Sequence, residues 1–265
     1  MVTFRHFLTN PIKKFVPDGG YTSIFRTIGF IGDSLSSGEH ESLKDGVKGY
    51  HDYYEYSWGQ FIARKCGLTA INFSKGGLTC YEFFENYIKE RKNPFIEENR
   101  CQAYVIALAV NDMNQLDGGF YKEGFGSFDD VDWENEDNNK NSYVGQYVRI
   151  IQKLRKFEPK CRIFVMTTPK EKPFKERHKM AMEFITKLPE YFDFLYVLNL
   201  WKYAPIYDAK FGKRYFCGGH MNAAGYKFTA DMVMTYIDYY IRKYPEDFTQ
   251  VAFIGKDVHN EKEKW

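Results

Sequence analysis

The sequence predicts a three-layer α/β/α fold, with a five-stranded parallel sheet between helices. Two observations lead to this prediction. Short apolar runs alternate with amphipathic stretches from about residue 24 to residue 243, which is the rhythm of repeated strand–helix units. The apolar runs are continuous rather than alternating, as expected for strands that are buried on both faces of a parallel sheet.

The first half of the chain supplies three strands and two helices. The run IFRTIGFI stops at Gly32, and WGQFIARK has apolar residues at helical spacing before Cys66-Gly67 ends the helix. AYVIALAV is a strongly apolar strand. We expect strands at 24–31, 69–73 and 103–110, and helices at 58–65 and 81–89.

The second half continues the alternation. YVGQYVRIIQKLRKF is a long amphipathic helix, and the run RIFVMT is a strand that Pro169 closes. FDFLYVL is the fifth strand, and the final helix follows it. We expect strands at 162–167 and 192–198, and helices at 143–157, 176–188 and 223–242.

Two segments interrupt this rhythm. Residues 115–141 are rich in glycine and acidic residues and predict a long surface loop, and residues 39–55 (EHESLKDGVKGYHDYYE) predict a second irregular insertion. Long loops at the carboxyl edge of a sheet often cover a substrate, and a solvated insertion with no role is equally compatible with this length. No repeat or linker divides the chain, so residues 1–265 are expected to form a single domain.

Composition narrows the choice of partner and compartment. The 265 residues carry a net charge of only +2, which gives no reason to expect a nucleic acid or a membrane as partner. No stretch approaches the ~20 apolar residues of a membrane span, and MVTFRHFLTNPIKKF lacks the apolar core of a secretory signal. The five cysteines contain no CxxC pair. We expect a cytoplasmic protein with reduced thiols, although a chain that follows a removed signal would look the same.

Polar residues follow the expected strands where acyl transfer would need them. Ser34 comes after the first strand, Gly76 and Gly77 after the second, Asn111 after the third, and His220 precedes the last helix. Ligand sites in such sheets lie beyond the carboxyl ends of the strands. A serine can attack an ester, a histidine can take its proton near neutral pH, and an amide with backbone N–H groups can hold the oxyanion.

These four segments resemble the sequence blocks of SGNH/GDSL esterases and lipases. FIGDSLSSG matches the GDS(L) block, NFSKGGLT the second block, ALAVNDMN the GxND block and CGGHMNAAGY the DxxH block, in the family's order over residues 29–226. The resemblance implies a flavodoxin-like SGNH hydrolase fold. It implies Ser34 as nucleophile, His220 as base, and an oxyanion hole made by the backbone N–H groups of Ser34 and Gly77 and the side chain of Asn111. Gly76 is the alternative to Gly77.

Two positions depart from the family pattern. Ala109 replaces the glycine of GxND, and Cys217 stands where the family has the aspartate that orients the histidine. A neutral thiol does not stabilise an imidazolium as a carboxylate does. A backbone carbonyl could hold His220 and leave a Ser–His dyad, which we favour. An acid could substitute (Glu39, Asp112 or Asp208), or the site could be weakened to a binding pocket. We expect Cys217 to be a small buried thiol.

Taken together, the residues favour a serine ester hydrolase that works through an acyl-enzyme. We expect a small O-acyl group, such as acetyl, possibly on a carbohydrate. The alternatives are a weakened carbohydrate- or acyl-binding relative, a thioesterase or a lysophospholipase. A helix-capping role is the simpler interpretation of Ser34 or Asn111 taken alone. No GxSxG, P-loop, dinucleotide or HExxH motif is present and the six histidines are scattered, so no cofactor or metal is implied.

Overall fold

The computed structural model describes residues 10–265, and its centre is the predicted five-stranded sheet. All four neighbouring strand pairs are parallel. Of the five strands of this sheet, the one that comes first in the chain lies between those that come second and third. This is the strand order of flavodoxin-like sheets. Across the sheet the strands are β4 (Thr69–Ser74), β1 (Thr27–Gly32), β5 (Ala103–Ala107), β6 (Arg162–Met166) and β7 (Leu195–Leu198).

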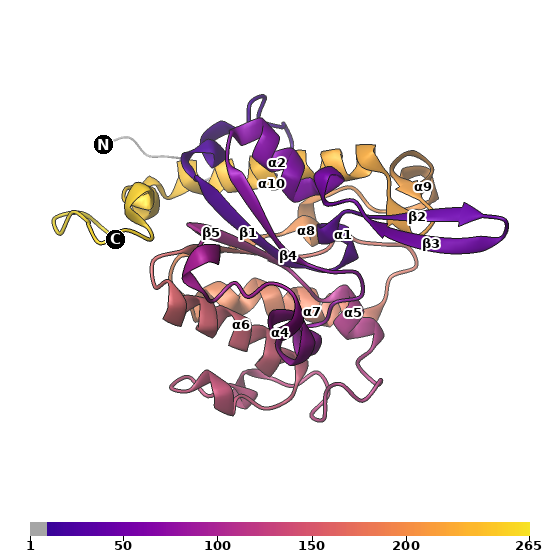
Figure 1. Cartoon of the computed structure of the whole chain (residues 1–265), viewed down its shortest axis with the longest axis horizontal. Helices are drawn as coiled ribbons and strands as arrows, with labels where there is room; N and C mark the ends of the chain where they lie inside the picture. The colour runs from indigo at the N-terminus through magenta and orange to yellow at the C-terminus, as the bar shows by residue number, and fades with distance from the viewer. Residues whose placement is uncertain (1–9) are drawn as a thin grey trace.

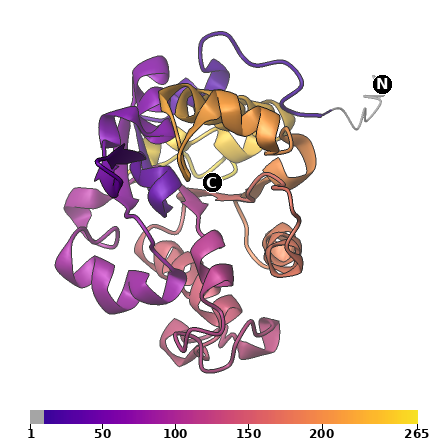
Figure 2. The same ribbon diagram turned by 90° about the vertical axis from the view of Figure 1, so that its right-hand side faces the viewer.

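Helices cover both faces of this sheet (Figure 1). One face carries α2 (Trp58–Cys66) and the long α10 (Ala223–Lys243), which pack against each other. The other face carries α6 (Tyr143–Phe157) and α7 (Glu176–Lys187). The view turned by 90° shows the same separation into two helical layers (Figure 2).

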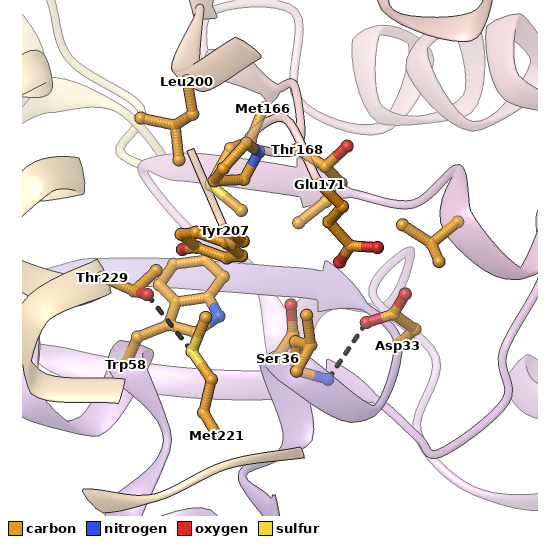
Figure 3. Close-up of a pocket in the computed structure, with 14 residues that line it drawn as sticks. Asp33, Ser36, Trp58, Met166, Thr168, Glu171, Leu200, Tyr207, Met221 and Thr229 are labelled. Carbon is orange, nitrogen blue, oxygen red and sulfur yellow. Dashed lines mark hydrogen bonds between the residues drawn. The ribbon is translucent and has the colours of Figure 1, made fainter. Parts of the chain in front are cut away.

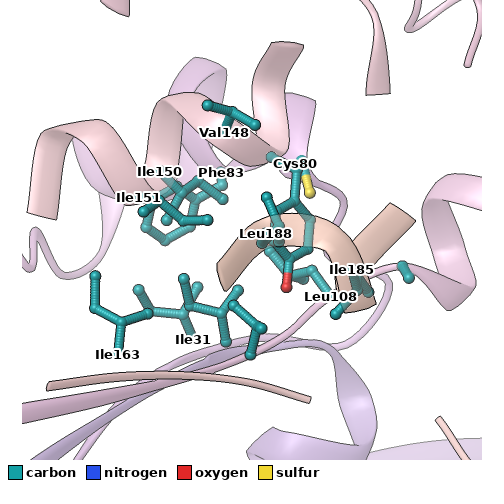
Figure 4. Close-up of a cluster of buried hydrophobic side chains, with 14 of the residues drawn as sticks. Ile31, Cys80, Phe83, Leu108, Val148, Ile150, Ile151, Ile163, Ile185 and Leu188 are labelled. Atoms are coloured by element: carbon teal, nitrogen blue, oxygen red, sulfur yellow. The ribbon is translucent and has the colours of Figure 1, made fainter. Parts of the chain in front are cut away.

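The strands alternate their side chains between two apolar clusters. In β5, Tyr104 and Ile106 join the cluster under α6, whereas Ala103 and Val105 join the cluster under α10. Figure 4 shows part of the first cluster, in which Ile150 and Ile151 of α6 lie above strand residues of β1 and β6. Full burial of one such aliphatic side chain stabilises the fold by roughly 1.5–3 kcal/mol. Burial on both faces is why these strands read as continuous apolar runs.

Most predicted elements occur within a few residues of their expected bounds, and the helix at 143–157 matches both bounds. The helix expected at 81–89 is divided into α3 (Cys80–Glu82), a π-helical stretch (Phe83–Tyr87) and α4 (Ile88–Glu90). The apolar run at 103–110 ends as a strand at Ala107, because Val110 already begins α5 (Val110–Asn114).

The insertion at 39–55 is regular, so the prediction of an irregular segment was wrong. It contains an antiparallel hairpin of β2 (Glu39–Lys44) and β3 (Val47–Asp52). Asp45 and Gly46 form its turn with φ of 54° and 77°, as expected for the Asp-Gly pair of a tight hairpin. Most side chains of the hairpin are exposed. Its strands therefore do not need the continuous apolar run by which a buried strand is recognised in sequence. The hairpin projects from the sheet beside α9 (Ala209–Tyr215) (Figure 1).

The insertion at 115–141 is the expected long loop, with two short 3-10 turns, Phe128–Asp130 and Glu136–Asn138. Both turns pack against α6, and the loop buries Tyr121 and Val131 in the core. It lies at the bottom of both views, away from the hairpin (Figures 1 and 2).

The expectation about a secretory signal depends on the N-terminal stretch MVTFRHFLTNPIKKF. Its first nine residues, 1–9, lie outside the described residues. Among residues 10–265, no helix combines the length and the apolar character needed to cross a bilayer.

Candidate active site

Ser34 is the first residue of α1 (Ser34–Ser37), and one residue, Asp33, separates it from the end of β1. Asp33 is the N-cap residue, and its carboxylate accepts the N–H of Leu35 at 3.0 Å. A side chain at Gly32 would collide with Ser36, so the turn from strand to helix requires glycine there. Within residues 10–265, the Ser34 hydroxyl makes no hydrogen bond. The capping interpretation of Ser34 is therefore wrong, and its hydroxyl is available for other chemistry.

Asn111 reaches from the end of β5 toward the Ser34 turn. Its Nδ2 lies 3.4 Å from Asp33 Oδ2 and 3.4 Å from the carbonyl oxygen of Leu78. The residue is the second of α5, whose N-cap is Ala109, so Asn111 is not a helix cap either. The side-chain amide thus lies between the turn that follows β1 and the turn that follows β4.

Gly76 and Gly77 form the turn that follows β4, which the N–H of Leu78 closes on the carbonyl of Lys75 at 3.2 Å. A side chain on Gly76 would collide with the carboxylate of Glu39, whereas Gly77 faces open space and has φ of 75°. Among the described residues, no acceptor takes the N–H of Gly77 or of Ser34. Two free backbone donors near an Asn amide are what an oxyanion hole needs.

His220 lies on a small hairpin of β8 (Phe216–Cys217) and β9 (His220–Met221) that leads into α10. Its Nε2 is 2.9 Å from Glu39 Oε1, and its Nδ1 is 3.8 Å from Glu41 Oε2. Nδ1 is buried and has no hydrogen-bond partner in the described part of the chain. The favoured arrangement, a backbone carbonyl that holds His220, is therefore not found within residues 10–265, because the β2–β3 hairpin brings carboxylates to the ring instead.

The other two candidate acids lie elsewhere. Asp112 is buried and accepts the N–H of Cys80 at 2.7 Å and the hydroxyl of Tyr121. Asp208 is the N-cap of α9, where it accepts two backbone N–H groups. Of the three acids considered from sequence, Glu39 alone contacts His220.

Sequence reasoning missed Glu41. The signal was present: Glu39 and Glu41 are separated by one residue, so on a strand they point to the same side. The Asp45-Gly46 pair marks that strand as part of a hairpin. What the sequence could not show was that this side faces His220.

Cys217 was expected to be buried, and this is wrong. Its thiol is exposed, because it lies on the two-residue β8 at the surface rather than in the core. The Sγ atom lies 3.9 Å from the carbonyl oxygen of Glu41. All five cysteines are free thiols, and the other four are buried.

The pKa values of the two carboxyl groups near His220 are shifted in opposite directions. Burial raises the pKa of Glu39, although His220 opposes this effect and Asp52 adds to it. A hydrogen bond from Lys48 and one from the backbone N–H of Gly219 lower the pKa of Glu41. Of the two, Glu41 is therefore the carboxyl whose surroundings favour the ionised form.

Asp33, next to Ser34, has a strongly displaced carboxyl pKa. Burial raises it from the ordinary 3.8 to about 7, and the charges of Asp112 and Glu39 add to this rise. The N–H of Leu35 acts in the opposite direction. Asp33 thus changes its protonation state near neutral pH.

Two hollows adjoin the site. The first, here called the inner cavity, has a volume of about 60 Å³ and begins at Asp33 and Leu35, on either side of Ser34 in sequence. Figure 3 shows its mainly apolar wall, which includes Trp58, Met166 and Leu200. The second, the outer cleft, has a volume of about 470 Å³ and is open and largely polar. Its lining includes Glu171, Lys172, Tyr207, Asp208, Phe216 and Gly218.

Comparison with known families gives one match. The family model described as GDSL-like Lipase/Acylhydrolase matches residues 28–233, a range that includes Ser34, Asn111 and His220. The chain belongs to this family. The family is one of lipases and acylhydrolases. A comparison with curated protein sequences gave no match.

Solved structures share the fold at low sequence identity. A family two carbohydrate esterase from Clostridium thermocellum, in complex with cellohexaose, superposes with a TM-score of 0.57 at 15% identity over 82% of this chain. A family 2 carbohydrate esterase from Corynascus thermopiles (Myceliophthora fergusii) gives 0.55 at 16% over 80%. This chain spans 65% of the length of each. A possible lipase from Chitinophaga pinensis gives 0.51 at 17%, over 83% of this chain and 98% of its own.

Proposed function

We propose that this GDSL-family esterase removes short O-acyl groups, acetyl above all, from a carbohydrate through an acyl-enzyme on Ser34. The observation that carries the proposal is the group at the carboxyl edge of the sheet. The hydroxyl of Ser34 is free of hydrogen bonds within residues 10–265, and the amide of Asn111 lies beside the Ser34 turn. His220 lies on β9, which is in contact with α1.

Each group has a defined part in the proposed reaction. Ser34 Oγ attacks the ester carbonyl while His220 takes its proton. The N–H groups of Ser34 and Gly77 and the amide of Asn111 stabilise the oxyanion of the tetrahedral intermediate. His220 then gives its proton to the departing alcohol, which leaves an acyl-serine. A water that His220 deprotonates attacks this ester and releases the acid and free Ser34.

The size of the inner cavity supports a short acyl group. Its volume is about 60 Å³, and one water needs roughly 10–15 Å³ on the same scale. The cavity therefore has room for about four to six water-sized groups, which is enough for an acetyl to butyryl chain. Its apolar wall is suited to methyl and methylene groups and offers few partners for a charged acid.

The outer cleft supports a polar alcohol. Glu171, Lys172 and Asp208 offer acceptors and donors for hydroxyl groups, and Phe216 offers an aromatic surface. The ring of Tyr50, which is 56% exposed, lies edge-on to His220 with the ring centroids 5.7 Å apart. Two proteins of the same fold are named carbohydrate esterases, so acetylated sugars are the first natural substrates to test.

The test is hydrolysis of p-nitrophenyl acetate, butyrate and octanoate by the wild type and the variants Ser34→Ala and His220→Ala. We expect turnover of acetate and butyrate, little turnover of octanoate, and a loss of at least about 10³-fold in either variant. Release of acetate from an acetylated xylo-oligosaccharide then tests the alcohol. The proposal fails if the wild type hydrolyses the acetate no faster than Ser34→Ala.

A further inference from the structure

We infer that Glu41, carried on the β2–β3 hairpin, is the positioning acid of His220 and takes the role that Cys217 cannot fill. In this arrangement the Glu41 carboxylate accepts the Nδ1 proton of His220, and Nε2 is left to take the proton of Ser34. The inference rests on the proposed function, because it assigns the group that orients the base of that reaction.

Strand geometry places two carboxylates on one side of β2. Residues i and i+2 of a strand point to the same face, about 6.5–7 Å apart. Glu39 and Glu41 have this spacing, and the imidazole of His220 lies between them, with one nitrogen toward each. β2 contacts both β8 and β9, so the hairpin is packed along the segment that carries the histidine.

The Glu41 carboxylate occupies the turn between Cys217 and His220. Its Oε2 accepts the backbone N–H of Gly219 at 2.7 Å, and a Cβ atom on Gly218 would lie only 2.5 Å from its carboxyl carbon. The two glycines between Cys217 and His220 thus leave room for a side chain from another strand. The carboxylate that the family supplies from the position of Cys217 arrives here from the hairpin.

Glu41 also has the properties that an orienting acid needs. Its side chain is only 7% exposed, and Lys48 pairs with it at 2.7 Å. The hydrogen bonds from Lys48 and Gly219 lower its pKa, so the group is anionic. The ring nitrogen on its side is Nδ1, which is buried and has no hydrogen-bond partner in residues 10–265. The distance of 3.8 Å is longer than a hydrogen bond, and contacts of this kind commonly shorten when substrate binds.

Glu39 has a different position. Its carboxylate lies between Nε2 of His220 and the backbone at Gly76, which borders the predicted oxyanion hole. An ester carbonyl that enters the hole needs this space, and Ser34 needs Nε2. Glu39 must therefore leave Nε2 during turnover, so it is not the acid that orients the ring.

The experiment compares kcat and KM of Glu41→Gln, Glu39→Gln and a matched control, Glu136→Gln, with p-nitrophenyl acetate. Glu136 is equally buried, at 7% exposure, and is also paired with lysine, but lies in the 115–141 loop. We expect Glu41→Gln to lower kcat by 10²- to ~10⁴-fold with little change in KM. We expect Glu136→Gln to keep the wild-type kcat. The loss of kcat in Glu39→Gln should be at least about tenfold smaller than the loss in Glu41→Gln.

A rescue separates positioning from a merely structural role. Cys217→Asp restores a carboxylate at the family position, so it should recover at least about tenfold in kcat when combined with Glu41→Gln. In the wild type it should change kcat by less than about threefold, because Glu41 already fills the role. Thermal unfolding of each variant shows whether it is folded.

Three results would overturn the inference: Glu41→Gln with near-wild-type kcat, a larger loss in Glu39→Gln than in Glu41→Gln, or no rescue by Cys217→Asp in a folded double variant. Failure of the proposed function gives a different result, since Ser34→Ala would then equal the wild type.

Discussion

Replacement of Asp33 by asparagine should make the protein more stable at neutral pH, and the size of the effect can be worked out from the structure. Burial raises the pKa of Asp33 from 3.8 to about 7. The difference corresponds to about 4 kcal/mol, since one pKa unit equals ~1.4 kcal/mol. Asparagine has nearly the same shape and is an equally good N-cap residue, so α1 should still form.

The direction follows from proton linkage. Below pH 3.8 the carboxyl is protonated in both the folded and the unfolded chain, and it adds no pH dependence. Between pH 3.8 and about 7 the unfolded chain loses the proton and the folded chain keeps it, so the wild type loses stability as pH rises. Above about pH 7 the loss is complete. The asparagine side chain does not titrate, so the advantage of Asp33→Asn should grow from about pH 4 to about pH 7 and then stay constant.

The assay is urea unfolding followed by circular dichroism at about pH 4.5, 6 and 8. Asp208→Asn is the matched control, because Asp208 is also an N-cap aspartate but is exposed and has a lowered pKa. Substitution of Asp208 should lower the stability of the protein at neutral pH, which is the opposite of the change expected for Asp33→Asn. A difference between Asp33→Asn and wild type that is the same at all three pH values would refute the assignment of a buried, proton-binding carboxyl beside Ser34.

Two further predictions concern other polar groups. Asn111→Ala should lower kcat by 10²- to 10³-fold, which corresponds to about 3–4 kcal/mol, and leave KM within about threefold. Steady-state kinetics with p-nitrophenyl acetate measures both constants. A rise in KM as large as the fall in kcat would contradict an oxyanion role. Tyr147→Phe should raise the free energy of unfolding by about 1 kcal/mol, since the buried hydroxyl has no partner in residues 10–265. Tyr104→Phe should lower it, because that hydroxyl accepts the N–H of Cys101. Urea unfolding measures the change in the free energy of unfolding of both variants. Changes of the same sign would contradict this difference between the two hydroxyl groups.

The sheet was predictable from sequence because its strands are buried on both faces. The apolar runs that contain Ile31, Val105 and Phe164 have no other simple interpretation in a chain that alternates strands with helices. The strand-end positions of Ser34 and Asn111 follow from the same pattern, because parallel strands deliver their carboxyl ends to one edge.

The β2–β3 hairpin was not predictable in this way. Its side chains are mostly exposed and polar, so hydrophobic periodicity is absent and only the Asp45-Gly46 turn signal remains. The contact between Glu41 and the His220 hairpin joins residues separated by 178 positions, and local sequence carries no information about such pairing. Cys217 could be recognised as a departure from the family, but its replacement by a distant acid required the structure.

Covalent labelling tests the central claim, that Ser34 is the nucleophile, most directly. Wild-type protein is incubated with a fluorophosphonate, digested, and analysed by peptide mass spectrometry, with Ser34→Ala and Ser36→Ala as parallel samples. Ser36 lies in the same short helix, but its side chain is buried. Because the reagent is not expected to reach it, Ser36→Ala is a matched control. The account predicts one modified peptide with the label on Ser34, and labelling that Ser36→Ala retains and Ser34→Ala abolishes. Label on another residue, or undiminished labelling of folded Ser34→Ala, would contradict it.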